Sequence, residues 1–489
     1  MTGHVRQPSA LLTVAEMARV DRLCIDGGVP GIVLMRTAGR AVADAIRARW
    51  SPSPVTVLCG PGNNGGDGFV VAALLRDVGW PVTLAPLGPI ASLRGDAAVA
   101  AADWMGGIVP FGPAAVAGAG LVVDAVFGAG LARPVDGVVA ETLRAVRCPV
   151  VAVDVPTGVD GDDGSVRGTA VPAALTVTFF RRKPGHLLAP GRFLCGETVV
   201  ADIGIPDRVL ETIAPLAAEN GPDLWRSRLP LPDAAGHKFG RGHVIVWSGR
   251  RMTGAARLAA RAAQRAGAGL VTVVGPEEAA AVHRPALDGI MVRSLAGLAA
   301  VTRLVADRRV TAAVIGPGAG RGPMTRLVVE AAAAAGPPLV LDADALSVFA
   351  GDPDALARLL AGRPAVVTPH EGEFATLFGA VGGGKPARAR IAAARLGAVV
   401  VLKGPDTVIA APDGRVAINA NAPADLATAG SGDVLAGVVG ALVGQGTDPF
   451  DAARAAVWLH GEAGRLGGSG LVADDLPALL PAAFRAARA

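Results

Sequence analysis

The residues best suited to chemistry in this chain stand in two glycine-rich segments. The first, residues 60–68, reads Gly-Pro-Gly-Asn-Asn-Gly-Gly-Asp-Gly and follows an apolar run at residues 55–59. Its five glycines allow the backbone to pass close to a ligand, and the start of a following helix favours an anion such as phosphate. We therefore expect a strand, a glycine-rich turn and a helix from Phe69, which together bind a nucleotide or a phosphorylated small molecule.

The second segment, residues 429–437, opens a helix in the same way but carries a carboxylate, Asp433, in its first turn. Backbone N–H groups at a helix start can neutralise charge on a transferring phosphoryl group, and a carboxylate beside them can deprotonate an attacking hydroxyl. The plainer interpretation is a capping aspartate, which is weakened because Ser431 could already cap the helix. Two such sites in one chain predict two linked activities.

The first segment fits neither of two common nucleotide-binding motifs. Its helix is entered through Asn-Asn-Gly-Gly-Asp-Gly, which differs from the Gly-x-Gly-x-x-Gly of a dinucleotide site, and it lacks the Gly-Lys-Ser/Thr ending of a P-loop. Redox-cofactor and P-loop interpretations are therefore disfavoured, and an ordinary strand-to-helix turn stays as the alternative.

Two aspartates, Asp124 and Asp154, stand at or just past the ends of apolar runs, where an unpaired carboxylate is costly to bury. Either one alone could be a cap or turn residue. Together with Asn64 and the hydroxyl of Thr157 they supply hard oxygen ligands, which suit an alkali cation better than zinc. The sequence has no Cys/His cluster with zinc spacing.

Two other segments give weaker signals. His370 lies in Thr-Pro-His-Glu-Gly-Glu and could be an ordinary loop histidine. The segment from Lys403 to Thr407 follows an apolar run and could bind phosphate.

The elements that position these residues alternate between apolar runs and helical stretches, after a helical region at residues 10–50. The runs expected to form strands are residues 55–59, 82–86, 121–127, 150–155 and 175–179, and then 243–247, 270–274, 312–315, 339–341, 365–367 and 399–402. This alternation predicts doubly wound α/β sheets. Ligands of such sheets bind beyond the carboxyl ends of strands, so we expect the first site to be assembled from three strand ends.

Length and composition indicate two domains in a cytoplasmic protein. The chain has 489 residues, and a Pro-rich stretch without strand periodicity places the boundary near residues 215–230, giving domains 1–220 and 221–489. The net charge is +4 without a long Lys/Arg run, which disfavours nucleic-acid binding. Four widely spaced cysteines indicate a reducing compartment, and neither a signal peptide nor a membrane span is expected.

Residues 10–210 resemble the NAD(P)HX epimerase domain, and residues 60–68, 123–130, 153–158 and 176–179 carry its motifs in order. The resemblance implies that Asp154 acts at the reacting centre and that potassium is bound by Asn64, Asp124 and Thr157. Thr157 stands where the family usually has Ser and keeps the hydroxyl. The implied substrate contacts are Asp154 and two runs, Asn63, Asn64, Gly65, Gly66, Asp67 and Gly128, Ala129, Gly130, Leu131, Ala132, Arg133, Pro134.

The chain from residue 225 onward is similar to the ADP-dependent NAD(P)HX dehydratase domain of the ribokinase-like superfamily. The motifs are residues 237–240, 254–256, 316–320, 342–346, 368–370, 402–404 and 430–435. By this resemblance the hydrated nicotinamide nucleotide contacts Ala255, Gly320, His370 and Asp433, with Asp433 as catalytic base. Glu371 stands where many members have Pro. ADP is implied to lie against Lys403, Gly404, Pro405, Asp406, Thr407 and Gly432.

The domain order is that of bifunctional bacterial NAD(P)HX repair enzymes. The expected ligands are NADHX, NADPHX, K⁺, Mg²⁺ and ADP as co-substrate, in a homo-oligomer with no nucleic-acid or membrane partner. One alternative is a ribokinase-like small-molecule kinase fused to an accessory domain, and another makes the first domain a non-catalytic interaction module. The sequence leaves ADP versus ATP and NADHX versus NADPHX open.

Overall fold

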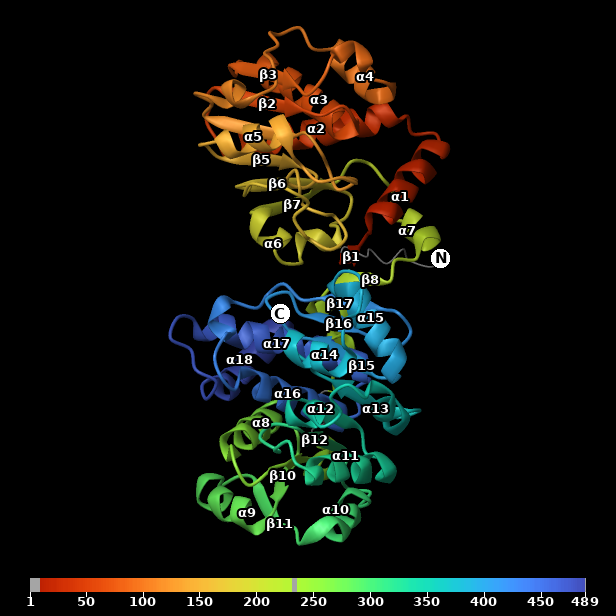
Figure 1. The fold of residues 1–489 in the computed structure, drawn as a ribbon, viewed down its shortest axis with the longest axis vertical. Coiled ribbons are helices and arrows are strands. Elements are labelled where there is room, and N and C mark those ends of the chain that lie inside the picture. Colours follow the sequence, from red (N-terminus) through yellow and green to blue (C-terminus); the bar gives the residue numbers. More distant parts are fainter. Residues whose placement is uncertain (1–8, 231–234, 489) are drawn as a thin grey trace. The chain divides into compact units, whose positions relative to one another are not determined.

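The computed structural model describes residues 9–230 and 235–488. The chain folds into two compact units, one ending at Ala218 and the other beginning at Glu219 (Figure 1). Both units are α/β, as the alternation of apolar runs and helical stretches predicts.

The first unit is built on a six-stranded parallel sheet with the order β3-β2-β4-β5-β6-β7. Its strands are β2 (Val55–Cys59), β3 (Val82–Pro86), β4 (Leu121–Ala125), β5 (Val150–Val153), β6 (Leu175–Phe179) and β7 (Glu197–Ala201). Because β2 lies between β3 and β4, the chain reverses its direction of winding at β2. A crevice at the carboxyl ends of β2 and β4 is where such sheets bind ligands.

Helices cover both faces of this sheet, which is why its central strands are mainly apolar. Val57 packs with α2 and α3 in one cluster, whereas the next residue, Leu58, packs with α5 in another. The helices are α1 (Val14–Asp26), α2 (Gly31–Arg47), α3 (Asn63–Asp77), α4 (Gly95–Ala102), α5 (Gly137–Ala145), α6 (Gly191–Leu194) and α7 (Val209–Ile213). Two short strands, β1 (Ala10–Leu11) and β8 (Ala217–Glu219), pair antiparallel.

The glycine-rich segment differs from the prediction, because α3 begins at Asn63 and not at Phe69. A Cβ atom at Gly65 would lie 1.9 Å from the carbonyl oxygen of Gly60, and one at Gly68 would lie 2.6 Å from the Cβ of Ala125. These glycines therefore serve close packing of α3 against the strand ends. The expected strands 121–127 and 150–155 are also shorter, ending at Ala125 and Val153.

The second unit contains the strand order β17-β16-β15-β14-β13-β12-β9-β10-β11. Its strands pair in parallel, except that β16 runs antiparallel to both β15 and β17. All six predicted runs form strands. The strands are β9 (His243–Trp247), β10 (Leu270–Gly275), β11 (Met291–Ser294), β12 (Ala312–Ile315), β13 (Leu339–Leu341), β14 (Ala365–Val367), β15 (Val399–Leu402), β16 (Val408–Ala410) and β17 (Val416–Ile418).

The main core of the second unit is formed where α8, α16 and α17 pack on this sheet. The last helix of the chain, α18, has 13 residues and packs with them. The helices are α8 (Thr253–Arg265), α9 (Glu277–His283), α10 (Gly297–Val305), α11 (Pro323–Ala335), α12 (Asp344–Ser347), α13 (Pro353–Leu360), α14 (Glu371–Phe378), α15 (Lys385–Leu396), α16 (Ser431–Gly444), α17 (Pro449–Gly467) and α18 (Leu476–Arg488).

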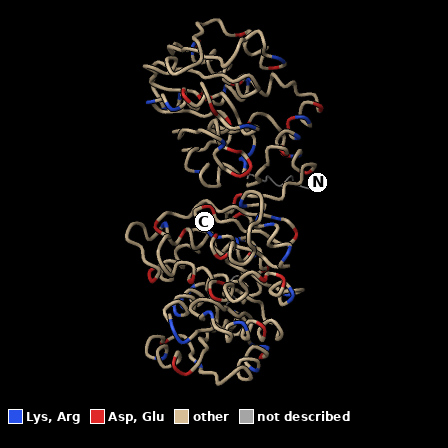
Figure 2. The backbone as a smooth tube through the Cα atoms, viewed as in Figure 1, with Lys and Arg blue, Asp and Glu red and all other residues tan. Residues whose placement is uncertain are grey.

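Charged residues of both signs are interspersed along the described backbone (Figure 2). Among the described residues, no helix has the length and apolar character needed to cross a membrane.

Candidate functional sites

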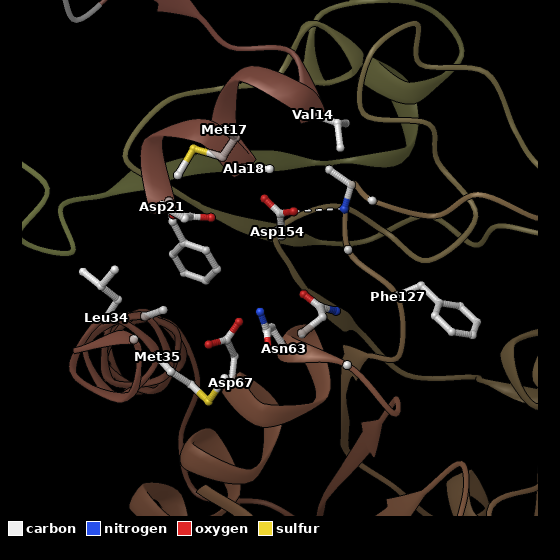
Figure 3. A pocket seen from close by; sticks show the side chains of 18 of the residues that line it. Val14, Met17, Ala18, Asp21, Leu34, Met35, Asn63, Asp67, Phe127 and Asp154 are labelled. Carbon is white, nitrogen blue, oxygen red and sulfur yellow. Dashed lines mark hydrogen bonds between the residues drawn. The ribbon is translucent and has the colours of Figure 1, made fainter. Parts of the chain in front are cut away.

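The first unit has a cavity of about 460 Å³ at the carboxyl ends of its strands. Its lining includes residues after β2, β4, β5 and β6, together with parts of α1 and α2. Figure 3 shows the carboxyl groups of Asp21, Asp67 and Asp154 around this one space. The predicted site residues among the lining are Asn63, Asn64, Asp67, Gly128, Ala129, Gly130, Leu131 and Asp154.

Asp154 is held from several sides. Its Oδ1 accepts hydrogen bonds from Lys183 Nζ at 2.6 Å and from Thr178 Oγ1 at 2.9 Å, and its Oδ2 accepts one from the Ala129 N–H at 2.9 Å. Burial alone would raise the pKa of Asp154, but the Lys183 ammonium and these hydrogen bonds outweigh burial and lower the pKa to about 2. Asp154 is therefore an anion at neutral pH.

Asp21 and Asp67 have the opposite character. Among the described residues, no hydrogen-bond donor reaches either carboxyl group. Burial raises the pKa of Asp21 to about 6, with the Lys183 charge opposing this and the Asp154 charge adding to it. Burial, followed by the charges of Asp154 and Asp21, raises the pKa of Asp67 well above its ordinary value. The cavity therefore joins an ionised carboxylate to carboxyl groups that hold protons more tightly.

Two of the three predicted potassium ligands lie in contact beside this cavity. The fully buried Asp124 carboxylate accepts hydrogen bonds from the Thr157 hydroxyl at 2.6 Å and the Thr157 N–H at 2.8 Å. Within the described residues no Lys or Arg pairs with Asp124, and burial raises its pKa. The third, Asn64, lies beside Gly128, and its buried Nδ2 has no partner among the described residues.

Other implied contacts of the first site do not line the cavity. Gly65 and Gly66 are buried in the first turn of α3. Ala132, Arg133 and Pro134 are exposed and lie outside the lining. Their assignment as substrate contacts stays a prediction.

Sequence reasoning missed four residues of the first site: Asp21, Thr178, Lys183 and His186. The last three lie on β6 or just after it, so the strand-end rule applied to a fourth strand would have found them. Asp21 lies on α1, and nothing in its local sequence marks it.

In the second unit, Asp433 lies in the first turn of α16, where the N-cap is Gly430 with a φ of 92°. Ser431, which could have capped the helix, does not do so, because its hydroxyl donates to the Leu426 carbonyl. No side chain of the described residues caps α16. Burial raises the pKa of Asp433 to about 7, and the charge of Asp342 adds to this effect while Lys403 opposes it. A carboxyl group with that pKa can exchange a proton near neutral pH.

Lys403 connects Asp433 to its neighbours. Its Nζ donates to Asp342 Oδ1 at 2.7 Å and lies 3.8 Å from Glu373 Oε2. A Cβ atom at Gly432 would lie 3.4 Å from this ammonium nitrogen. The predicted Gly432, Asp433 and Lys403 are therefore brought together, and Asp342 and Glu373 are additions that the motifs did not single out as site residues.

The remaining predicted residues are His370 at the start of α14, Gly320 on the loop after β12 and Ala255 in the first turn of α8. His370 caps α14 in a reciprocal pair with Glu373 and bridges to Lys403 in the parallel direction. The N–H of Gly320 donates to Asp344 at 2.8 Å, and Ala255 lies against Gly318. Asp344 also raises the pKa of Asp433, after burial and Asp342.

The predicted nucleotide loop, Lys403 to Thr407, is held by hydrogen bonds from Lys385. Lys385 Nζ donates to Asp406 Oδ1 at 2.5 Å and to the Lys403 carbonyl at 3.4 Å. The Thr407 hydroxyl closes the loop on the Gly404 carbonyl at 2.9 Å, and Pro405 is exposed. Glu371 forms a bidentate ion pair with Arg388 at 2.8 and 3.1 Å, so it does not displace His370. Among the described residues, no group of three His, Cys, Asp or Glu side chains could by itself hold a metal ion.

Known proteins match both units. A family model described as YjeF-related protein N-terminus matches residues 31–185, and one described as NAD(P)H-hydrate dehydratase matches residues 244–477. The bifunctional NAD(P)H-hydrate repair enzyme Nnr of Moorella thermoacetica is 38% identical, over 97% of this chain and 96% of that protein. The Escherichia coli enzyme of the same name is 34% identical, over 97% and 95%.

A crystal structure of the ADP/ATP-dependent NAD(P)H-hydrate dehydratase from Bacillus subtilis, co-crystallised with ATP and Mg²⁺, is 28% identical to this chain. The match covers 55% of this chain and 98% of the Bacillus subtilis chain, with a TM-score of 0.48.

Two α/β units with separate polar sites define a two-domain enzyme. The chain belongs to the family of bifunctional NAD(P)H-hydrate repair enzymes. The resemblance inferred from the ordered motifs is thereby confirmed.

Proposed function

We propose that this chain repairs hydrated NADH and NADPH. The first unit interconverts the R and S epimers of NAD(P)HX, and the second dehydrates the S epimer at the expense of ADP, releasing AMP and phosphate. The observation that carries the proposal is the match to bifunctional repair enzymes over 97% of the chain, so that both units are covered. This favours repair over the alternative of a kinase fused to a non-catalytic module.

The first cavity suits a reaction that passes through a cation. When the hydroxyl on the carbon next to the ring nitrogen takes up a proton and leaves as water, the broken C–O bond leaves a positive charge delocalised onto that nitrogen. Asp154 is an anion of the cavity wall, already fixed by three hydrogen bonds, and can stabilise this charge without reorganising. Addition of water to the other face of the ring, with loss of a proton, gives the other epimer.

In the second unit, Asp433 is proposed to remove the proton from the hydroxyl of the S epimer as this oxygen attacks the terminal phosphoryl group of ADP. The N–H groups at the start of α16 and the Lys403 ammonium lie beside Asp433 and can neutralise charge on the phosphoryl oxygens. Phosphorylation converts a poor leaving group into phosphate, and elimination then restores the reduced nicotinamide ring.

The proposed cofactors are K⁺ in the first unit and Mg²⁺ in the second. For K⁺, the supporting observation is Asp124, a fully buried carboxylate with no cationic side chain beside it among the described residues and with the Thr157 hydroxyl in contact. For Mg²⁺, the support is chemical, since phosphoryl transfer from a nucleotide ordinarily uses a divalent ion held largely by the phosphates themselves. Few protein ligands are then required.

The testing experiment incubates the purified full chain with a mixture of both epimers, with and without ADP or ATP. Chromatography follows each epimer, and absorbance follows recovery of NAD(P)H. We expect epimer exchange without nucleotide and full conversion to NAD(P)H only with it. Accumulation of a stable phosphorylated product would instead favour the kinase alternative.

A further inference from the structure

The segment that follows β6 closes one side of the first cavity. It runs through Lys183, Pro184, Gly185 and His186, and residues 184–186 form a single turn of 3-10 helix. Lys183 lines the cavity and is 2% exposed, and His186 is 3% exposed. Neither residue belongs to the segments that the resemblance assigns to substrate or potassium.

Lys183 fixes the Asp154 side chain. Its Nζ donates to Asp154 Oδ1 at 2.6 Å and to Thr178 Oγ1 at 2.9 Å, while the Thr178 hydroxyl donates to the same carboxylate oxygen at 2.9 Å. The carboxylate is therefore held in one orientation, with Oδ2 directed at the Ala129 N–H. Through that last bond the orientation of Asp154 also fixes the loop after β4.

His186 fixes the Asp154 backbone. Asp154 has a φ of 68°, a conformation that is costly for a residue other than glycine and that needs support from its surroundings. His186 Nε2 lies 2.8 Å from the Asp154 carbonyl oxygen, and Nδ1 accepts the Lys183 N–H at 3.0 Å. Burial, followed by the charge of Lys183, lowers the pKa of His186 to about 4, so the ring is neutral and donates through Nε2.

The groups around Asp154 show why it needs a cation. Asp21 on α1, Asp67 on α3 and Asp96 on α4 also line the cavity, and Lys183 is the only Lys or Arg among its described lining residues. Neutral His186 contacts the Asp154 carbonyl oxygen, and the buried Cys195 thiol is close enough to respond to the Asp154 charge. Without Lys183, a buried carboxylate among other carboxyl groups would retain a proton.

We propose that Lys183 is a positioning residue of the epimerase site, which keeps Asp154 as the anion of the cavity and fixes its direction. The inference rests on the proposed epimerase function of the first unit. It assigns Lys183 no proton transfer, because its ammonium acts through Asp154.

The test measures epimerisation by the full chain from about pH 5 to about pH 9, starting from one purified epimer and subtracting the uncatalysed rate. Lys183→Met keeps the length of the side chain and removes its charge. We expect the rate at neutral pH to fall by at least about tenfold and to recover as the pH rises, because Asp154 then ionises only at higher pH. The Lys183 charge also lowers the pKa of Asp21 and Asp67, so their titration shifts in this variant too. A variant that keeps this charge and removes a contact of Asp154 is therefore measured beside it.

Arg181→Met is the matched control. Arg181 is a buried cation two positions away that pairs with Asp207 at 2.6 Å and does not line the cavity. Its loss should leave the shape of the pH profile unchanged. Dehydration of the S epimer with ADP reports on the second unit in every variant.

Thr178→Val is the second variant, measured beside Lys183→Met and sufficient by itself if Lys183→Met does not fold. It keeps the Lys183 charge and removes one hydroxyl that donates to Asp154, so we expect a smaller shift in the same direction. A profile unchanged in both variants would overturn the role of Lys183. Absence of epimerisation by the wild-type chain would instead overturn the proposed function. This outcome is distinguishable from failure of the Lys183 role, in which the wild-type chain is active and the variants keep its pH profile.

Discussion

Replacement of Asp433 by Asn tests the second site most directly. The side chain keeps its size and loses the ability to accept a proton, while Lys403 keeps its bond to Asp342. A positioned general base contributes roughly 10² to 10⁴ in rate, so we expect dehydration to fall by at least about a hundredfold. Epimerisation should be unchanged because the first cavity lies in the other unit.

The pH dependence of the wild-type enzyme follows from the same carboxyl group. With a pKa of about 7, Asp433 is about one-tenth ionised one pH unit below that value and about nine-tenths ionised one unit above it. Dehydration with saturating substrate should therefore rise about tenfold over these two units and then level off. The Asn variant should lack this rise.

The assay follows NAD(P)H absorbance from purified S epimer with ADP and Mg²⁺, with epimer exchange measured in parallel as the control. Stability supplies a second check. Burial raises the folded-state pKa of Asp433 above its ordinary 3.8, so the carboxyl group destabilises the fold as pH rises from about 4 towards about 7. The Asn variant should thus unfold at no lower temperature than wild type at pH 8. Near-normal dehydration by this variant would remove Asp433 from the mechanism.

Four other outcomes are expected. Asp154→Ala should abolish conversion of the R epimer while S is still consumed in excess ADP; disappearance of both at the wild-type rate would make Asp154 purely structural. Gly128→Ala should slow epimerisation, because its Cβ would lie 3.0 Å from both Asn64 Oδ1 and Asp154 Oδ2. Gly130→Ala should lose less epimerase activity, because its Cβ would have no described protein atom within 4 Å. Exchange of K⁺ for tetramethylammonium should slow epimerisation and leave dehydration intact. Asp124→Asn should remove this dependence of epimerisation on K⁺. Equal epimerisation rates of the wild-type chain in both salts would argue against the proposed potassium site. Fragments 1–220 and 221–489 should each fold and keep one activity, and failure of both would refute independent domains.

Much of the fold is predictable from the sequence because the central strands are buried on both faces. Residues 55–59, 312–315 and 399–402 are apolar runs in which Thr56 is the one polar residue, and each is a strand with the expected limits. The error at α3 has a physical cause. Glycine disfavours helices in isolation, but close packing of Gly65 and Gly68 against backbone and strand side chains requires the absence of a Cβ atom.

The candidate sites are predictable where they lie at strand ends and unpredictable where a distant element supplies the partner. Asp154 is identifiable because it follows a buried strand. Asp21 is not, since its position on α1 becomes meaningful only when α1 lies over the cavity. Strand β11 (Met291–Ser294) escapes prediction for a related reason, because it is largely exposed and carries only two apolar residues.

Asp154 and Asp433 show what the sequence does not contain. Both are aspartates at the ends of apolar or glycine-rich segments, and both are largely buried, yet their acidities lie on opposite sides of the ordinary value. Lys183 donates directly to Asp154, and the pKa of Asp154 falls to about 2. Lys403 donates to Asp342 instead, and Asp433 has a pKa of about 7. The first carboxylate can thus stay charged opposite a cation, and the second can accept a proton. This division of roles is set by which carboxylate each lysine contacts. Loss of the lysine contact should therefore change the protonation of the aspartate, and with it the reaction, more than conservative substitutions elsewhere in either site.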